Sequence, residues 1–227
     1  METKPLAWIN KVFWVTKKDL KSEFRTRYSL NAIFMFALVT LTVISFSIGQ
    51  FSLENKAKCS LLWVVLFFSA MAGLSQIFVK EEENNTSNTL KLIASPEVIF
   101  VGKLLFNLTL LFLLEIVIVP LFIVLMDFRI SNPYVFFTVL ILGSLGLVCS
   151  TTIIAAIVAK SNVKGALFAV LSFPILLPLL ITAINGTALA LSESTWSIAF
   201  SEYSVLFSYA MVMLTLSILL FDFVWEE

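Results

Sequence analysis

The 227-residue sequence predicts an all-α integral membrane protein with six transmembrane helices. Six continuous apolar runs take up most of the chain, and each is close to the roughly 20 residues that a helix needs to cross a bilayer. The runs lack the alternation of polar and apolar residues that the strands of a transmembrane barrel require. Lysine and arginine gather on alternate sides of the runs, which is typical of multi-pass proteins.

Two regions follow from the positions of these runs. Residues 1–30 form an N-terminal segment, and residues 31–227 form a transmembrane domain. The predicted spans are residues 31–49, 60–79, 104–126, 134–159, 165–185 and 203–221. The pieces outside the spans are too short to bury a core of their own. We therefore expect one domain in the membrane, with a cytoplasmic loop at residues 80–103.

The distribution of basic residues predicts the orientation of the chain. Twelve of the 15 Lys and Arg residues lie in the N-terminal segment or in the loops after the second and fourth spans. Only Lys56, Lys58 and Arg129 lie in the other connections. Because loops rich in Lys and Arg stay on the cytoplasmic side, both termini are expected there. About thirty hydrophilic or amphipathic residues precede the first run, so we expect no cleavable signal peptide.

The N-terminal segment has the pattern of an amphipathic helix. Its apolar residues recur at roughly helical spacing, and lysine and arginine lie between them. The apolar set is Trp8, Ile9, Val12, Phe13, Leu20, Phe24 and Tyr28, and the basic set is Lys11, Lys17, Lys18, Lys21 and Arg25. Such a helix lies in the membrane surface, with its basic face toward anionic headgroups. The alternative, a basic segment that only anchors the topology, is compatible with this interpretation.

The loop between the second and third spans is the most polar part of the chain. Its Asn, Ser and Thr residues can cap a short helix that carries Leu90, Ile93 and Leu92, and Pro96 ends that helix. A short amphipathic helix on the cytoplasmic side is suited to docking in the groove of a partner. A solvated loop remains the alternative.

One ionisable side chain, Glu115, lies in the middle of the third span. A charge at that depth costs roughly 3 kcal/mol, and no span offers a basic partner at a comparable depth. We expect Glu115 to be protonated or to face a polar cavity. It then either contacts a substrate or a proton, or it is a neutral carboxyl hydrogen-bonded to Ser, Thr or a backbone carbonyl.

Small residues and prolines mark the fourth and fifth spans. Small side chains in the fourth span would let a neighbouring helix approach closely; they are Gly143, Ser144, Gly146, Ser150, Ala155 and Ala156. Pro174 and Pro178 in the fifth span predict a kinked or interrupted helix. Neighbouring helices or water must then satisfy the freed carbonyls, so this span should not be wholly exposed to lipid.

The sequence argues against an enzyme. There is no histidine, which removes the commonest general base and a common metal and haem ligand. Gly102-Lys103 lacks the earlier glycine of a phosphate-binding loop, so any ATP hydrolysis is expected in a separate subunit. A membrane protease or acyltransferase would need a polar cluster near the bilayer face with a base at the Ser or Thr nucleophile, and the sequence does not indicate one. We therefore predict no catalytic, cofactor-binding or metal-binding residues.

Five segments carry a resemblance to a known family. They are residues 46–49 (FSIG), 62–64 (LWV), 89–96 (TLKLIASP), 160–165 (KSNVKG) and 173–181 (FPILLPLLI). With the amphipathic N-terminal helix and the order of six spans, they resemble the membrane subunit of ABC-2 type transporters. Within that class the chain is similar to CcmB, the haem-exporter subunit of cytochrome c maturation. The family's loop often has glycine and an acidic residue where this chain has Asn88 and Lys91.

The resemblance implies an ABC-2 type permease architecture and a set of partners. These are a second copy of the chain, a cytosolic CcmA-like ATPase subunit and haem-handling CcmC-like and CcmD-like membrane subunits. It implies the bacterial cytoplasmic (inner) membrane, or an organellar inner membrane, and haem as cargo. The polar loop would be the coupling helix, with its ATPase-coupling residues at Thr89, Leu90, Leu92, Ile93, Ser95 and Pro96. An ABC-2 permease for a lipid, drug or glycan and a membrane scaffold without transport are the alternatives.

Overall fold

The structure, a computed structural model, describes residues 5–48, 53–83, 86–159, 161, 164–192 and 196–226. The described chain is helical, without strands. Its helices are α1 (Pro5–Thr26), α2 (Tyr28–Ile48), α3 (Asn55–Leu74), α4 (Gln76–Glu83), α5 (Ser87–Ile93), α6 (Pro96–Leu125), α7 (Pro133–Ala159), α8 (Lys164–Leu191) and α9 (Trp196–Glu226). Six helices are long and apolar enough to cross a membrane, with α3 and α4 counted as one. The prediction of an all-α membrane fold is therefore confirmed.

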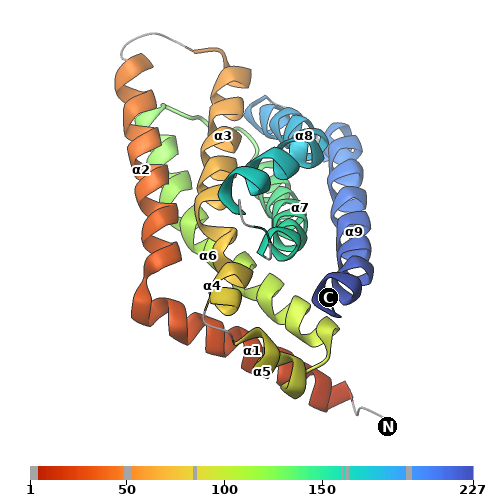
Figure 1. Cartoon of the computed structure of the whole chain (residues 1–227). Helices are drawn as coiled ribbons and strands as arrows, with labels where there is room; N and C mark the ends of the chain where they lie inside the picture. The colour runs from red at the N-terminus through yellow and green to blue at the C-terminus, as the bar shows by residue number, and fades with distance from the viewer. Residues whose placement is uncertain are drawn as a thin grey trace.

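The spanning helices form a bundle around α7, and α1 lies across one end of this bundle (Figure 1). The central helix α7 packs against α3, α4, α6, α8 and α9. The short helices α4 and α5 lie at the same end as α1 and the last turns of α9 (Figure 1). The small residues predicted to allow close approach in the fourth span are all buried on α7.

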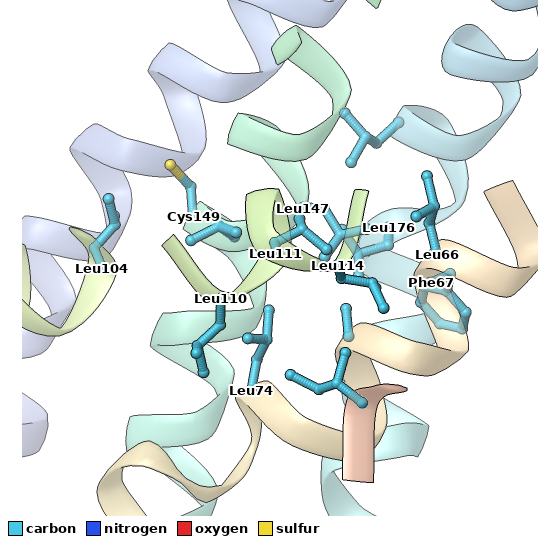
Figure 2. Close-up of a cluster of buried hydrophobic side chains, with 14 of the residues drawn as sticks. Leu66, Phe67, Leu74, Leu104, Leu110, Leu111, Leu114, Leu147, Cys149 and Leu176 are labelled. Carbon is cyan, nitrogen blue, oxygen red and sulfur yellow. The ribbon is translucent and has the colours of Figure 1, made fainter. Parts of the chain in front are cut away.

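Leucines from four helices meet in the core of the bundle (Figure 2). Leu74 comes from α3, Leu114 from α6, Leu147 from α7 and Leu176 from α8, and none of them is more than 1% exposed. Large apolar side chains also cover the outer surface, for example Phe223, which is 75% exposed on α9. A helix that is apolar all round suits a protein whose outer surface meets lipid.

Two elements begin or bend at positions that differ from the hydropathy boundaries. The second span consists of α3 and α4, which are separated at Ser75. Helix α6 begins at Pro96, eight residues before the predicted span, because proline at the first helical position needs no backbone hydrogen bond. Parts of the segments that carry the family resemblance, residues 49, 160 and 162–163, lie outside the described residues, as do loop residues 84–85.

Helix α8 continues without interruption through both of its prolines. The hydroxyl of Tyr209 on α9 donates a hydrogen bond to the backbone oxygen of Ile175, at 2.8 Å, between Pro174 and Pro178. Both prolines are exposed, whereas Leu176 and Leu179 are buried against the bundle. A hydroxyl from the neighbouring helix thus joins α9 to α8 within the segment where the prolines remove backbone donors.

The close contact between α3 and α7 depends on a glycine. A Cβ atom at Gly143 would lie 2.2 Å from a ring carbon of Trp63, which is only 1% exposed. The indole cannot easily move, because its Nε1 donates to Thr187 Oγ1 on α8 at 2.9 Å. Trp63 therefore joins three helices at one point.

We predict that Gly143→Ala lowers the thermal unfolding temperature of the detergent-purified protein, because the methyl group overlaps the fixed indole. The expected loss of stability is about 1–3 kcal/mol. Gly165→Ala on α8 is the matched control, since no atom lies within 4 Å of a Cβ there. Equal unfolding temperatures for the two variants would contradict the assigned contact.

Candidate functional site

The predicted coupling residues lie on and directly after α5, and they face in different directions. Leu90 is 7% exposed and packs into the core, whereas Leu92 is 89% exposed and Ile93 is 64% exposed. Thr89 and Ser95 are exposed, and Pro96 begins α6. The sequence interpretation placed Leu90, Leu92 and Ile93 together on one helix suited to docking, but in the structure Leu90 is buried and anchors α5. The outward apolar pair is Leu92 and Ile93.

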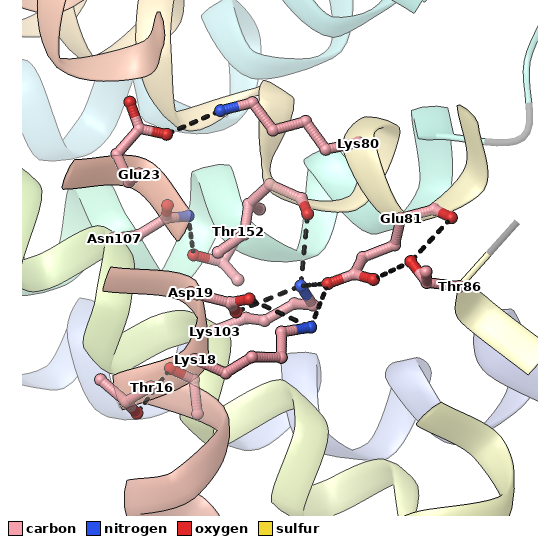
Figure 3. A network of polar contacts seen from close by, with 12 residues as sticks. Thr16, Lys18, Asp19, Glu23, Lys80, Glu81, Thr86, Lys103, Asn107 and Thr152 are labelled. Atoms are coloured by element: carbon pink, nitrogen blue, oxygen red, sulfur yellow. Dashed lines mark hydrogen bonds and ion pairs between the residues drawn. The ribbon is translucent and has the colours of Figure 1, made fainter. Parts of the chain in front are cut away.

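A buried network of ion pairs joins α1, α4 and α6 close to α5 (Figure 3). Lys103 on α6 has a side-chain exposure of only 1%, and its Nζ lies 3.3 Å from Asp19 Oδ2 and 3.0 Å from Glu81 Oε1. Lys18 lies 2.6 Å from the same oxygen of Glu81 and 3.3 Å from Asp19 Oδ1. Two cations and two anions therefore balance one another, which a buried charge requires.

The remaining hydrogen bonds of this network fix its position. Lys103 also donates to the backbone oxygen of Ile77 at 3.3 Å, and Thr86 donates to Glu81. The hydroxyl of Thr16 on α1 donates to the backbone oxygen of Gly102 at 2.9 Å. A Cβ atom at Gly102 would lie 2.7 Å from the side chain of Val15, so glycine permits the close approach of α1 and α6.

A second ion pair, between Glu23 and Lys80, stabilises the turn between α1 and α2. The carboxylate of Glu23 lies 2.6 Å from Lys80 Nζ, and it accepts a hydrogen bond from the backbone amide of Leu30 at 3.0 Å. Arg27 between the two helices has a φ of 56°, in the left-handed region. Such a backbone conformation is unfavourable for residues other than glycine. The contacts of Glu23 hold this turn in place.

These contacts shift the protonation of two side chains on α1. Burial of Glu23 works to raise its pKa, but the hydrogen bonds from Lys80 and the Leu30 amide outweigh burial and hold the pKa below its usual value. Burial works to lower the pKa of Lys18, whereas Asp19 and Glu81 together raise that pKa above its usual value. Both side chains therefore stay charged at neutral pH.

Aromatic rings connect α5 to the buried network. Lys91 Nζ on α5 lies 5.7 Å from the ring centroid of Trp225, near the end of α9. The ring centroids of Trp225 and Phe78 are 6.0 Å apart, and Lys103 Nζ lies 5.3 Å from the centroid of Phe78. Phe221 stacks on Trp225 at 5.3 Å. A continuous series of contacts thus leads from α5 through α9 and α4 to the ion pairs.

Glu115 lies in the interface between α6 and α7, where it is 5% exposed and accepts a hydrogen bond from Ser144. Two turns nearer the network, Asn107 donates to Thr152 Oγ1 at 3.0 Å (Figure 3). Both α6 side chains therefore have hydroxyl partners on α7. This geometry suits a hydrogen-bonded carboxyl, one of the two roles expected for Glu115 from the sequence.

Sequence reasoning missed the residues of the ion-pair network. Asp19, Glu81 and Lys103 are separated by about 60 and 22 residues along the chain and were interpreted as parts of a basic segment and a polar loop. One signal was available. Lys103 stands between apolar residues on both sides, a setting in which a lysine requires an acidic partner.

A family model described as CcmB protein matches residues 10–224, which is nearly the whole chain. A search of curated proteins gave no match.

We predict that Lys103→Met lowers the free energy of unfolding by about 3–5 kcal/mol, because it leaves Asp19 and Glu81 with one cation between them. The double variant Lys103→Met with Asp19→Asn restores the balance of charge with Lys18 and Glu81. Its loss should therefore be smaller than the sum of the two single losses by about 1 kcal/mol or more. Equilibrium unfolding in detergent micelles measures all four proteins, and additive losses would contradict the network.

We predict that the ion pair of Glu23 makes the protein sensitive to acid. Because the pKa of Glu23 is lowered on folding, its contribution to stability is present above the unfolded pKa of about 4.3 and is lost as the pH falls through the folded pKa. The wild type should unfold at a higher temperature than Glu23→Gln at neutral pH, and this difference should vanish in acid. Glu54→Gln, at an exposed carboxyl, is the control and should leave the profile unchanged.

Proposed function

The chain belongs to the CcmB family, the permease subunits of haem export in c-type cytochrome biogenesis, and we propose that it converts ATP-driven movement of a partner into rearrangement of its spans. ATP hydrolysis takes place in a CcmA-like cytosolic subunit. The chain pairs with a second copy of itself and works with CcmC-like and CcmD-like membrane subunits. The complex lies in the bacterial inner membrane with both termini of this chain in the cytoplasm.

The observation that carries the proposal is the exposed pair Leu92 and Ile93 on a short, anchored helix. These two large apolar side chains are adjacent in sequence and more than 60% exposed in the most polar loop of the chain, which suits a contact with a partner. Leu90 is buried beneath them, so a force on α5 reaches the bundle instead of being lost in a loose loop. The polar surroundings and the short helix suit a groove in a soluble partner.

Movement of α5 has a route into the spanning helices. Lys91 contacts Trp225 on α9, and α6 begins three residues after α5 ends. A partner shifts a conformational equilibrium only if it binds one arrangement more tightly than the other. We propose that the ATPase subunit in one nucleotide state binds the arrangement of α5 in which α6 and α9 are displaced, and that haem delivery follows from this displacement.

Glu115, Pro174 and Pro178 have supporting roles in this proposal. The carboxyl of Glu115 and the hydroxyl of Ser144 join α6 to α7 by a bond that α6 must keep or exchange when it moves. The prolines remove two backbone donors from α8, and Tyr209 joins the same segment to α9 through the backbone oxygen of Ile175. These residues would set which helices move together.

We predict that Leu92→Asp and Ile93→Asp, singly or together, abolish co-purification of the ATPase subunit and the maturation of c-type cytochromes, because a carboxylate is placed in an apolar contact. Thermal unfolding of both variants should match the wild type, since both side chains are exposed. Leu90→Ala should instead lower stability by about 2 kcal/mol or more through the cavity it leaves.

The control for added charge is Asn10→Asp, at an exposed position on α1 at the same end of the molecule. This variant should bind the ATPase subunit as the wild type does. Unchanged co-purification of the Leu92 and Ile93 variants would contradict docking on α5. Normal docking with unaffected cytochrome maturation would instead point to another cargo.

A further inference from the structure

A cleft of about 860 Å³ opens beside the ion-pair network. Its walls come from α1, the first residues of α2, helix α4, Thr86 and Phe106 of α6. The volume is within the roughly 300–1,000 Å³ of small-molecule sites. None of the roles proposed above for α5 or the spanning helices uses this cleft.

The cleft has an excess of positive charge. Its acidic groups Asp19, Glu23 and Glu81 each form an ion pair with a lysine. Lys21 and Arg25 also line the cleft, and neither has an acidic partner among the residues that the structure describes. Lys21 and Arg25 are at positions i and i+4 of α1, so they lie one turn apart on the same side of the helix. Two unneutralised cations side by side favour an anion between them.

The other lining groups favour an amphiphilic anion over a simple ion. The hydroxyl-bearing residues Ser22 and Tyr28 line the cleft together with the cations, whereas Ile77 and Phe106 add apolar surface. The ring of Tyr28 also holds Lys80, whose Nζ lies 5.2 Å from the ring centroid. A ligand with a phosphate and an attached hydrocarbon would satisfy both kinds of surface.

The position of the cleft indicates where such a ligand comes from. Tyr28 and Ser29 are the first residues of α2, a spanning helix, so the cleft lies at the depth where that helix leaves the membrane. Ile9, Phe13 and Phe24 on α1 are more than half exposed and require hydrocarbon to cover them. Helix α1 therefore lies at the level of the lipid headgroups, and its cleft opens among them.

We propose that this cleft binds the headgroup of an anionic phospholipid, with the phosphate between Lys21 and Arg25. Bound lipid joins α1 to α2 and α4 at the end of the bundle that carries α5. The ligand is held by a specific pair of cations, which distinguishes this site from a general attraction of a basic helix to the membrane surface.

The test uses the full-length protein in detergent, titrated with phosphatidylglycerol or phosphatidylcholine and followed by native mass spectrometry. The wild type should bind phosphatidylglycerol more tightly than phosphatidylcholine. Lys21→Gln with Arg25→Gln should weaken phosphatidylglycerol binding by roughly 30-fold, from the loss of two cationic contacts. Lys21→Arg should bind as the wild type does.

The matched control is Lys11→Gln with Lys17→Gln, which removes the same charge from α1 outside the cleft. This variant should keep its affinity for phosphatidylglycerol. An equal loss in the two double variants, or equal binding of the two lipids by the wild type, would overturn the site. Competition by inorganic phosphate at the concentration of the lipid would show a site for free anions and overturn the lipid assignment.

Both double variants should unfold at the wild-type temperature when lipid is absent, because all of the replaced side chains are exposed: Lys21 and Arg25 in one variant, and Lys11 and Lys17 in the other. Binding of the ATPase subunit is measured separately in the same variants. Loss of lipid binding with retained ATPase binding supports the cleft. Docking on α5 can also fail in its own test without affecting the lipid titration, so the two proposals are distinguishable.

Discussion

The arrangement of the end of the bundle that carries α1, α4 and α5 depends on the burial of Lys103. An ammonium group that is almost fully removed from solvent is strongly unfavourable unless anions surround it. The two anions are supplied by α1 and α4, so these helices must meet α6 at one point for the chain to fold. The same requirement brings in Lys18 as the second cation. Helix α1 is therefore part of the folded bundle as well as a surface helix.

Within the bundle, hydrogen bonds between side chains on neighbouring helices fix how each helix is rotated. Glu115 with Ser144 and Asn107 with Thr152 join α6 to α7, and Trp63 with Thr187 joins α3 to α8. Apolar contacts alone would allow several rotations in lipid, because every face of these helices is apolar. Polar pairs at specific positions, together with glycines at close contacts, favour a single rotation of each helix.

The two surfaces that we propose as binding sites lie at the end of the molecule where these constraints converge. Helix α5 carries the exposed apolar pair Leu92 and Ile93, and the cleft beside α1 is lined by the two cations Lys21 and Arg25. Both surfaces are in contact with the same ion-pair network. Glu81 contacts Thr86, which precedes α5, and Lys103 contacts Phe78, whose ring packs against Trp225. A rearrangement of α5 would therefore also move residues that contact the buried ion pairs.

Hydropathy and charge were sufficient to predict the six spans and the amphipathic α1, because length, apolar content and Lys/Arg bias are local properties of the chain. After the second span the sequence left a short helix and a solvated loop as alternatives; the structure has the helix α5, which ends at Ile93 and has no side-chain cap at its first turn. The burial of Leu90, the continuity of α8 through its prolines and the partners of Lys103 were not predictable from the sequence. Each of these depends on residues distant in sequence, such as Tyr209 for the backbone near Pro178. Only the tertiary structure decides which polar groups meet. A buried charge or carbonyl must have a partner, and the packing of the helices determines which partner lies within reach.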